Sequence, residues 1–144
     1  MTERPVEVAL ALVVRNGLWL VARRPDHVHL GGMWEFPGGK IEPGEDAVGA
    51  ALRELREECA VEAEAIETLS ALRWDYDDRR VRLVPVFCRW RRGEARPIGS
   101  VECRWVSCDA LRRLHMPAVN DPLIDWIARH THADKKEDQR STHG

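Results

Sequence analysis

The stretch between Gly38 and Val61 constrains the fold of this chain more than any other. It opens with a loop rich in glycine and proline, residues 38–45, and its pattern becomes helical from about Asp46. Apolar residues then recur at spacings of three and four, which places them on one face of an α-helix. These residues are Ala47, Ala50, Ala51 and Leu55. The pattern predicts a glycine loop followed by a helix that packs its apolar face against a core.

The same helix carries a second, acidic face. Glu54, Glu57 and Glu58 stand at positions i, i+3 and i+4, so their side chains are neighbours on the helix surface. Like charges at this spacing destabilise a helix by about 0.2–0.5 kcal/mol per pair. A divalent cation would offset this repulsion, because hard cations take oxygen ligands. A solvated acidic face is the alternative, but the preceding Gly38 and Gly39 favour a ligand site because they let the backbone approach a ligand closely.

Composition describes an ordinary soluble globular protein. The chain has 144 residues, of which 44% are hydrophobic and 32% are charged, enough for one domain with its own core. The net charge of −2 argues against a general nucleic-acid-binding protein, which would be basic. The sequence contains no apolar run of about 18 residues and no secretory signal. We therefore expect a cytoplasmic protein that does not bind a membrane.

We expect a single domain over residues 1–130. The segment 131–144 is polar and charged without an apolar anchor, and is predicted to be a disordered tail. The four cysteines show no C-x-x-C spacing, so we expect reduced thiols and no zinc site.

Hydrophobic patterning predicts further strands and helices along the chain. Strands are expected over residues 6–14, 18–22, 62–74, 81–90 and 103–106, with a hairpin turn at Asn16-Gly17. Pro85 lies inside one of these strands and predicts an edge position or a bulge there. A helix is expected near residues 109–114 with Ser107 as its cap. The last helix is expected to begin at Asp121 as its cap and to run to about residue 130.

Several polar and aromatic residues are candidates for ligand binding, each with a plainer alternative. Arg23-Arg24 follows a strand and could hold an anionic or carbonyl-bearing ligand, or simply improve solubility. Trp34 precedes the glycine loop and could face a flat base or pack in the core. His27 and His29 could bind a ligand or be ordinary loop residues. Asn120 could read a purine edge, because an amide has both a donor and acceptors, or could form a local turn.

The central stretch resembles the Nudix box, the signature of the Nudix hydrolases. Gly39, Glu45 and the run Arg53-Glu54-Leu55-x-Glu57-Glu58 match the pattern G-x5-E-x7-R-E-U-x-E-E-x-G-U, in which U is apolar. The chain departs from it at Ala60, where the family has glycine. A glycine at that point suits a left-handed helix end, and an alanine held there costs about 1–2 kcal/mol.

Along most of residues 6–130 the chain is similar to the MutT branch of that family, the 8-oxo-dGTP diphosphatases. This resemblance implies an α+β fold, an α/β/α sandwich on a mixed β-sheet with the box helix packed against it. It also implies a nucleotide-binding set that lies before the box and near the C-terminus, with Val119 as an insertion beside the last member. The set is Arg24, His29, Glu35, Phe36, Pro37, Gly38, Gly39, Lys40 and Asn120.

The resemblance implies a metal-dependent hydrolysis that releases a nucleoside monophosphate and pyrophosphate. Mg²⁺, or alternatively Mn²⁺, would be held by Glu54, Glu57, Glu58 and the Gly38 carbonyl. Catalysis would use Glu54 as the base that activates water, with Arg53 fixing its orientation and Glu45 pairing with Arg53. Glu102 lies where relatives carry a further acidic ligand or base, and is otherwise a surface residue.

Two kinds of alternative remain open at this stage. Within the family, the substrate could be CTP or another pyrimidine nucleotide, ADP-ribose, or a dinucleoside polyphosphate. In a different class, the chain could be a nucleotide-sensing domain without turnover, which the intact run of Arg53, Glu54, Glu57 and Glu58 disfavours. The expected partner is a small nucleotide and not nucleic acid, and the protein is expected to be a monomer or a homodimer.

Overall fold

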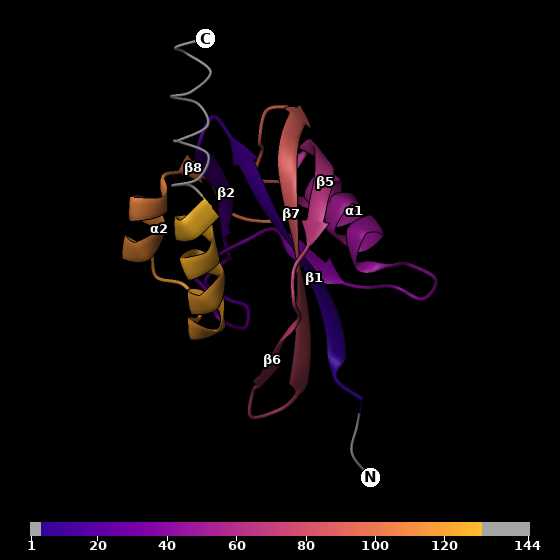
Figure 1. The fold of residues 1–144 in the computed structure, drawn as a ribbon. Helices are drawn as coiled ribbons and strands as arrows, with labels where there is room; N and C mark the ends of the chain where they lie inside the picture. The colour runs from indigo at the N-terminus through magenta and orange to yellow at the C-terminus, as the bar shows by residue number, and fades with distance from the viewer. Residues whose placement is uncertain (1–3, 131–144) are drawn as a thin grey trace.

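The computed structural model describes residues 4–130, and the predicted tail at 131–144 lies outside the described residues. Most of the elements belong to one mixed sheet and to the helices that cover it (Figure 1). A final helical segment occupies residues 121–130. The other elements are β1 (Val6–Arg15), β2 (Leu18–Arg23), β3 (Trp34–Glu35), β4 (Gly38–Lys40), α1 (Ala47–Cys59), β5 (Glu62–Thr68), β6 (Leu72–Asp75), β7 (Arg80–Arg92), β8 (Glu102–Val106), α2 (Cys108–Arg113) and the 3₁₀ turn η1 (Ala118–Asn120).

The sheet is built around the parallel pairing of β1 with β7. Its strand order is β3-β2-β1-β7-β5, with β4 added to β1, β6 to β7 and β8 to β2. All other pairings are antiparallel. The hairpin between β1 and β2 turns at Asn16 and Gly17, whose φ angles are 51° and 76°, as the sequence predicted.

Alternate residues of β1 build two separate hydrophobic cores, one on each face of the sheet. Ala9, Ala11 and Val13 pack with the apolar face of α1. Leu12 points to the opposite face, where its core includes residues of α2 and of the helix at 121–130, among them Leu111. Figure 1 shows α1 on one side of the sheet and the other two helices on the opposite side. The predicted α/β/α sandwich on a mixed sheet is confirmed.

The box helix has the predicted start and an unusual end. The Asp46 side chain caps its first turn and accepts a hydrogen bond of 2.7 Å from the Gly49 N–H. Ala60 ends it in the left-handed conformation, with φ 59° and ψ 29°, and its N–H bonds to the Arg56 carbonyl. The chain therefore adopts at Ala60 the left-handed helix end that suits a glycine, with an alanine in its place.

Three details of the predicted elements were wrong. Gly38–Lys40 is not loop but strand β4, because its backbone pairs with β1. The single strand expected over residues 62–74 is two strands, β5 and β6, separated by residues 69–71. Asp121 does not cap the last helix, because its φ of −54° and ψ of −46° are helical and η1 precedes it directly.

Pro85 does not lie on an edge strand, the first of the two alternatives predicted for it, but at an irregularity in the pairing of β7. It stands inside β7, between the parts of β7 that pair with β5 and with β6. The Pro85 carbonyl accepts a hydrogen bond of 2.8 Å from Leu69, in the segment between those two strands. The residue that lacks a backbone donor is therefore placed where the neighbouring pairing is interrupted.

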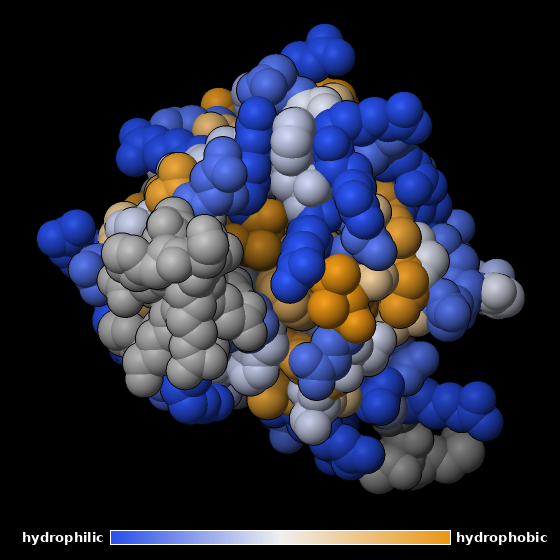
Figure 2. Space-filling view, turned by 45° about the horizontal axis from the view of Figure 1, so that its top comes forward, coloured by the Kyte–Doolittle hydropathy of each residue, from blue (hydrophilic) through white to orange (hydrophobic). Residues whose placement is uncertain are grey.

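Figure 2 shows hydrophilic residues over most of one face, with hydrophobic residues in small patches between them. Among residues 4–130, the exposed large hydrophobic side chains are Leu18, Ile66, Trp74, Ile98 and Val101. No helix within residues 4–130 has the length and apolar character needed to cross a membrane.

Candidate active site

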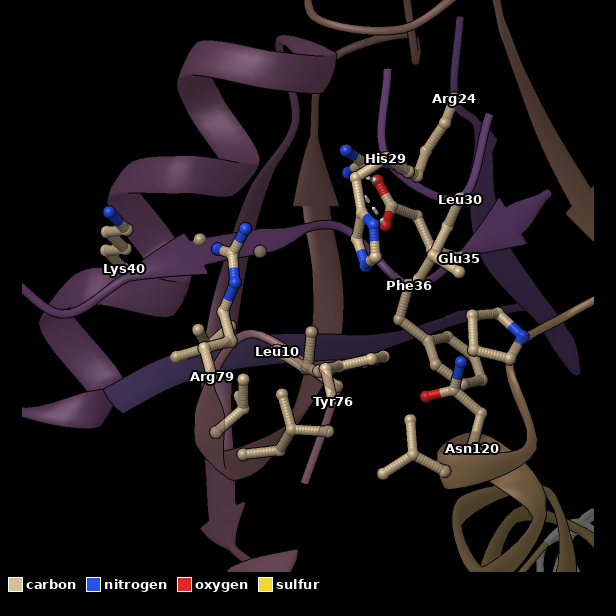
Figure 3. Close-up of a pocket in the computed structure, with 17 residues that line it drawn as sticks. Leu10, Arg24, His29, Leu30, Glu35, Phe36, Lys40, Tyr76, Arg79 and Asn120 are labelled. Atoms are coloured by element: carbon tan, nitrogen blue, oxygen red, sulfur yellow. Dashed lines mark hydrogen bonds and ion pairs between the residues drawn. The ribbon is translucent and has the colours of Figure 1, made fainter. Parts of the chain in front are cut away.

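A cavity of about 240 Å³ opens between the glycine strand and the β6–β7 hairpin. Figure 3 shows that its lining comes from segments far apart in the sequence. Most of the predicted nucleotide-binding residues contribute to this lining, so the fold brings them together. They are Arg24, His29, Glu35, Phe36, Gly38, Gly39, Lys40 and Asn120.

Arg24 organises one end of the cavity. Its Nε donates a hydrogen bond of 2.8 Å to the His29 carbonyl, and its Nη1 lies 3.3 Å from both carboxylate oxygens of Glu35. Burial raises the pKa of Glu35, and the charge and hydrogen bond of Arg24 partly oppose that rise. Figure 3 shows the two side chains joined beside the His29 ring. The second arginine of the pair therefore faces the cavity, while Arg23 lies near Asp26 and Glu102.

Asn120 and Phe36 form another wall of the cavity (Figure 3). Asn120 is 4% exposed. Among residues 4–130 it is the only polar or charged residue that is buried. Phe36 is 1% exposed, so its ring is fixed by packing. Trp34 is also buried, but it packs in the core against Arg104 and does not line the cavity.

Tyr76 and Arg79, at the tip of the β6–β7 hairpin, line the cavity and were missed by the sequence analysis. The Tyr76 ring meets the His29 ring edge-on, with 5.3 Å between ring centroids. Their sequence signal was the turn at Asp77-Asp78, which predicts a hairpin but does not indicate which loop the hairpin tip meets.

Arg53 binds the acidic residues of the box together. Its guanidinium donates to both carboxylate oxygens of Glu45, at 2.7 and 2.9 Å. It also donates to Glu54 at 2.9 Å and to Glu57 at 3.2 Å, and to the Lys40 carbonyl at 3.1 Å. The hydrogen bonds that Glu45 accepts from Arg53, the largest cause, and from the Glu42 N–H lower its pKa to about 2. One side chain thus links the helix, the loop before it and β4.

The two glycines of β4 are held against neighbours that leave no room for a side chain. A Cβ on Gly38 would lie 2.1 Å from the Ala9 carbonyl oxygen, and one on Gly39 would lie 2.5 Å from the Glu54 carboxylate. The Gly38 N–H also donates to Glu58 at 3.3 Å. The strand therefore runs directly beside the acidic face of α1, with the cavity lined by the same glycines.

The carboxylate oxygens on α1 beside β4 are suitable ligands for a divalent cation. Glu58 is largely buried, and burial raises the pKa of its carboxyl group to about 8, with Glu54 and Glu35 contributing further. A cation would favour the ionised form, and carboxylate oxygens are the ligands that Mg²⁺ takes. Within residues 4–130 no three acidic, histidine or cysteine side chains already surround a common point as metal ligands would. Arg53 instead holds Glu54 and Glu57.

Six predicted site residues do not line the cavity. Four of them, Arg53, Glu54, Glu57 and Glu58, belong to the network on α1 described above, and the other two are Pro37 and Glu102. The Pro37 carbonyl accepts a hydrogen bond of 2.8 Å from Ala11, which fixes the segment between β3 and β4. Glu102 begins β8 and accepts a hydrogen bond of 2.5 Å from Arg104, with Arg23 at 3.7 Å on its other side.

Comparison with known proteins identifies the family of this chain. The family described as NUDIX domain matches residues 8–126. The 8-oxo-dGTP diphosphatase of Escherichia coli is 30% identical over 129 residues, which cover 88% of this chain and 98% of that protein. The CTP pyrophosphohydrolase of Escherichia coli is 40% identical over 78 residues, but that match covers 54% of this chain and only 58% of that protein.

A solved structure supports the fold. The crystal structure of the MutT protein from Methanosarcina mazei Go1 superimposes with a TM-score of 0.80 at 21% identity, covering 90% of this chain and 98% of that one. The family match spans most of the chain and includes both the box and the cavity. The chain therefore belongs to the Nudix family and is a Nudix hydrolase.

Proposed function

We propose that this Nudix hydrolase is a magnesium-dependent nucleoside triphosphate pyrophosphohydrolase of MutT type. Its substrates would be purine deoxynucleoside triphosphates, including oxidised ones such as 8-oxo-dGTP, and its products the monophosphate and pyrophosphate. The observation that carries the proposal is the composition of the cavity. A buried amide and aromatic rings line one part of it, and the glycines beside the acidic helix line another.

Asn120 is suited to recognise the base. Its amide offers two N–H donors and a carbonyl acceptor, and its burial makes an unpaired edge costly, so a base that pairs with it is strongly preferred. The rings of Phe36 and Tyr76 provide apolar faces in the same cavity. Arg24 and His29 lie at its edge, where a guanidinium and an imidazole can contact polar atoms of a nucleotide.

The acidic face of α1 would hold the metal. Glu54, Glu57 and Glu58, with the Gly38 carbonyl, offer the oxygen ligands, and the buried Glu58 carboxylate gains most from a nearby positive charge. Glu57 is 60% exposed, so its side chain can turn away from Arg53 toward an ion. When bound, Mg²⁺ neutralises phosphate charge and lowers the pKa of a coordinated water molecule.

Glu54 is the proposed base for the attacking water. Its carboxylate is pressed against Gly39 and hydrogen-bonded to Arg53, so its orientation is fixed before the substrate binds. Arg53 also supplies a positive charge beside it, and Glu45 holds that guanidinium from the loop side. Glu102 is the weaker candidate because Arg104 and Arg23 already engage its carboxylate.

The test of the proposed substrate is an assay of pyrophosphate and phosphate release from a panel of nucleotides. The panel contains 8-oxo-dGTP, dGTP, CTP, 5-methyl-dCTP and ADP-ribose, each with Mg²⁺ and with excess chelator. We expect the highest kcat/KM for 8-oxo-dGTP or dGTP and no turnover with chelator. Asn120→Ala should reduce the preference among bases more than it reduces the summed activity. An equal loss on all substrates would assign Asn120 a structural role only.

The metal assignment needs its own measurement. Glu57→Gln and Glu58→Gln should each weaken Mg²⁺ binding in titration calorimetry and lower kcat by at least about 100-fold, while the circular dichroism spectrum stays unchanged. Glu67→Gln, on the exposed outer strand β5, is the matched control and should alter neither. Unchanged Mg²⁺ binding and turnover in both box variants would refute the assignment.

A pyrimidine nucleotide is the second candidate substrate. It is favoured by the 40% identity to a protein named CTP pyrophosphohydrolase, higher than the 30% to the 8-oxo-dGTP diphosphatase of the same organism. The match to the CTP pyrophosphohydrolase covers only 78 residues, however, against 129 for the 8-oxo-dGTP diphosphatase. A kcat/KM for CTP or 5-methyl-dCTP above that for both purine substrates would select this candidate.

A further inference from the structure

Two cysteines lie in contact at the end of the box helix, outside the cavity. Cys59 is the last residue of α1 and is fully buried, and Cys103 lies in β8 and is partly exposed. Their sulfur atoms are 3.8 Å apart. The Ser100 hydroxyl lies 3.6 Å from the Cys103 sulfur. The proposed hydrolysis uses neither thiol.

The loop between β7 and β8 holds this end of the helix. The N–H groups of Ile98 and Gly99 donate to the Glu58 carbonyl at 3.0 and 3.2 Å, and the Arg96 N–H donates to the Cys59 carbonyl at 2.9 Å. These bonds satisfy carbonyl groups that a helix end leaves without partners. Cys59 lies on the helix side of this junction between α1 and the β7–β8 loop, and Cys103 lies on the β8 side. The junction includes the backbone of Glu58, a proposed metal ligand.

We propose that Cys59 and Cys103 form a reversible disulfide when the protein meets a hydroperoxide, and that this modification site adjusts the end of the box helix. The separation of 3.8 Å must close by about 1.8 Å to reach the length of an S–S bond. Since Cys59 directly follows Glu58, part of this movement reaches the Glu58 backbone.

The difference in exposure sets the order of the chemistry. Cys103 can be reached from solvent and reacts first: its sulfur, as the thiolate, attacks an oxygen of the hydroperoxide, the O–O bond breaks, and the peroxide is reduced to an alcohol or water. The product is a sulfenic acid. The Cys59 sulfur then attacks the Cys103 sulfur, the S–O bond breaks, and water leaves with the Cys59 proton. Two thiols lose two electrons in total, and the peroxide accepts them.

Mass spectrometry of the native, folded protein tests the disulfide without reference to activity. Cleavage after arginine and lysine, except before proline, places Cys59 in the peptide 57–73 and Cys103 in the peptide 93–104, while Cys88 and Cys108 fall in two others. After treatment with tert-butyl hydroperoxide and alkylation, we expect the first two peptides to be linked. Dithiothreitol should separate them again. A Cys103 sulfinic acid with Cys59 still alkylated, or a link found only after unfolding, would overturn the proposal.

Variants separate the two steps. Cys59→Ser should trap the sulfenic acid at Cys103, detected as a dimedone adduct. Cys103→Ser should leave Cys59 unmodified under the same treatment. Cys88→Ala/Cys108→Ser is the matched control and should form the link as the wild type does. Dimedone labelling confined to another cysteine would contradict the assigned order of oxidation. If a variant folds poorly, the peptide map of the wild-type protein still shows whether the disulfide forms.

The effect on turnover rests on the proposed function. We expect oxidation to lower kcat on the best substrate of the panel at least threefold, to be reversed by dithiothreitol, and to be absent in Cys103→Ser. A linked peptide with unchanged turnover would refute the effect on the helix end. A protein that hydrolyses none of the nucleotides but still forms the link would refute only the proposed substrate class.

Discussion

Ala60 offers a direct test of how the box helix ends, because glycine should be better there than the natural residue. Its φ of 59° and ψ of 29° lie in the left-handed region, which costs a residue with a Cβ about 1–2 kcal/mol. Ala60→Gly removes that cost. Two losses oppose the gain: glycine makes the unfolded chain more flexible, worth about 0.4–1 kcal/mol, and the half-buried methyl group is lost, worth about 0.4 kcal/mol. The net expectation is a stabilisation of about 0.5 kcal/mol.

The same substitution in an ordinary helix should have the opposite sign. Ala128 lies inside the helical segment 121–130 and is also half-buried. There Ala128→Gly loses helix propensity of about 1 kcal/mol in addition to the methyl group. The free energies of unfolding of the two variants should therefore differ by about 1.5–2 kcal/mol. For a domain of this size that corresponds to a difference in Tm of roughly 5 °C.

Urea denaturation of the wild type and both variants, followed by tryptophan fluorescence without added metal, measures these free energies. Equal slopes of the transitions would show that the substitutions act on stability and not on the extent of unfolding. A loss for Ala60→Gly as large as that for Ala128→Gly would refute the reasoning, because it would mean that Ala60 is not held in a strained conformation in solution.

Three further predictions concern the box. Gly39→Ala should lower kcat on the best substrate at least tenfold with little change in urea stability, because the new Cβ would lie 2.5 Å from the Glu54 carboxylate; unchanged kinetics would show that this carboxylate has no fixed position. Arg53→Lys should lower kcat more than it raises KM in steady-state kinetics, because one ammonium group cannot bond to Glu45, Glu54 and Glu57 together. Glu45→Gln tests the lowered pKa of about 2: the ionised carboxylate stabilises the fold above the unfolded pKa, so the variant should be less stable at pH 7 and the difference should shrink as the pH falls from about 4.5 toward 2. A difference in unfolding free energy that is constant with pH would contradict it.

The local parts of the fold could be predicted because their signals are local. Ser107 caps α2 and Asn16-Gly17 turns the first hairpin, each as the sequence indicated, and the box helix starts near Asp46, where its pattern becomes helical. The errors arose where the structure depends on pairing between distant segments. Gly38–Lys40 looks like a loop because glycines disfavour strands, but β1 offers it a partner. Asp121 has the composition of a cap, but the preceding turn continues directly into the helix.

The acidic half of the site was also accessible from the sequence, since the spacing of its glutamates is fixed by one helix. The resemblance to the MutT branch contributed the residues before the box, and their shared cavity agrees with it. Tyr76 and Arg79 were missed for a physical reason. A hairpin tip has no preferred neighbour in its own sequence, and its contact with His29 exists only because β6 and β7 place it across the cavity.

This difference between local signals and contacts of distant segments explains why the sequence identifies the family more clearly than the substrate. The acidic helix and its glycine strand are adjacent in the chain, so one short pattern specifies both and the phosphate chemistry that they support. The wall that would select a base is assembled from three separated places, the loop at His29, the hairpin at Tyr76 and the turn at Asn120. Each can change independently without disturbing the box. A change in which base the enzyme prefers should therefore require substitutions in that wall alone. The turnover of the metal-loaded enzyme should remain unchanged.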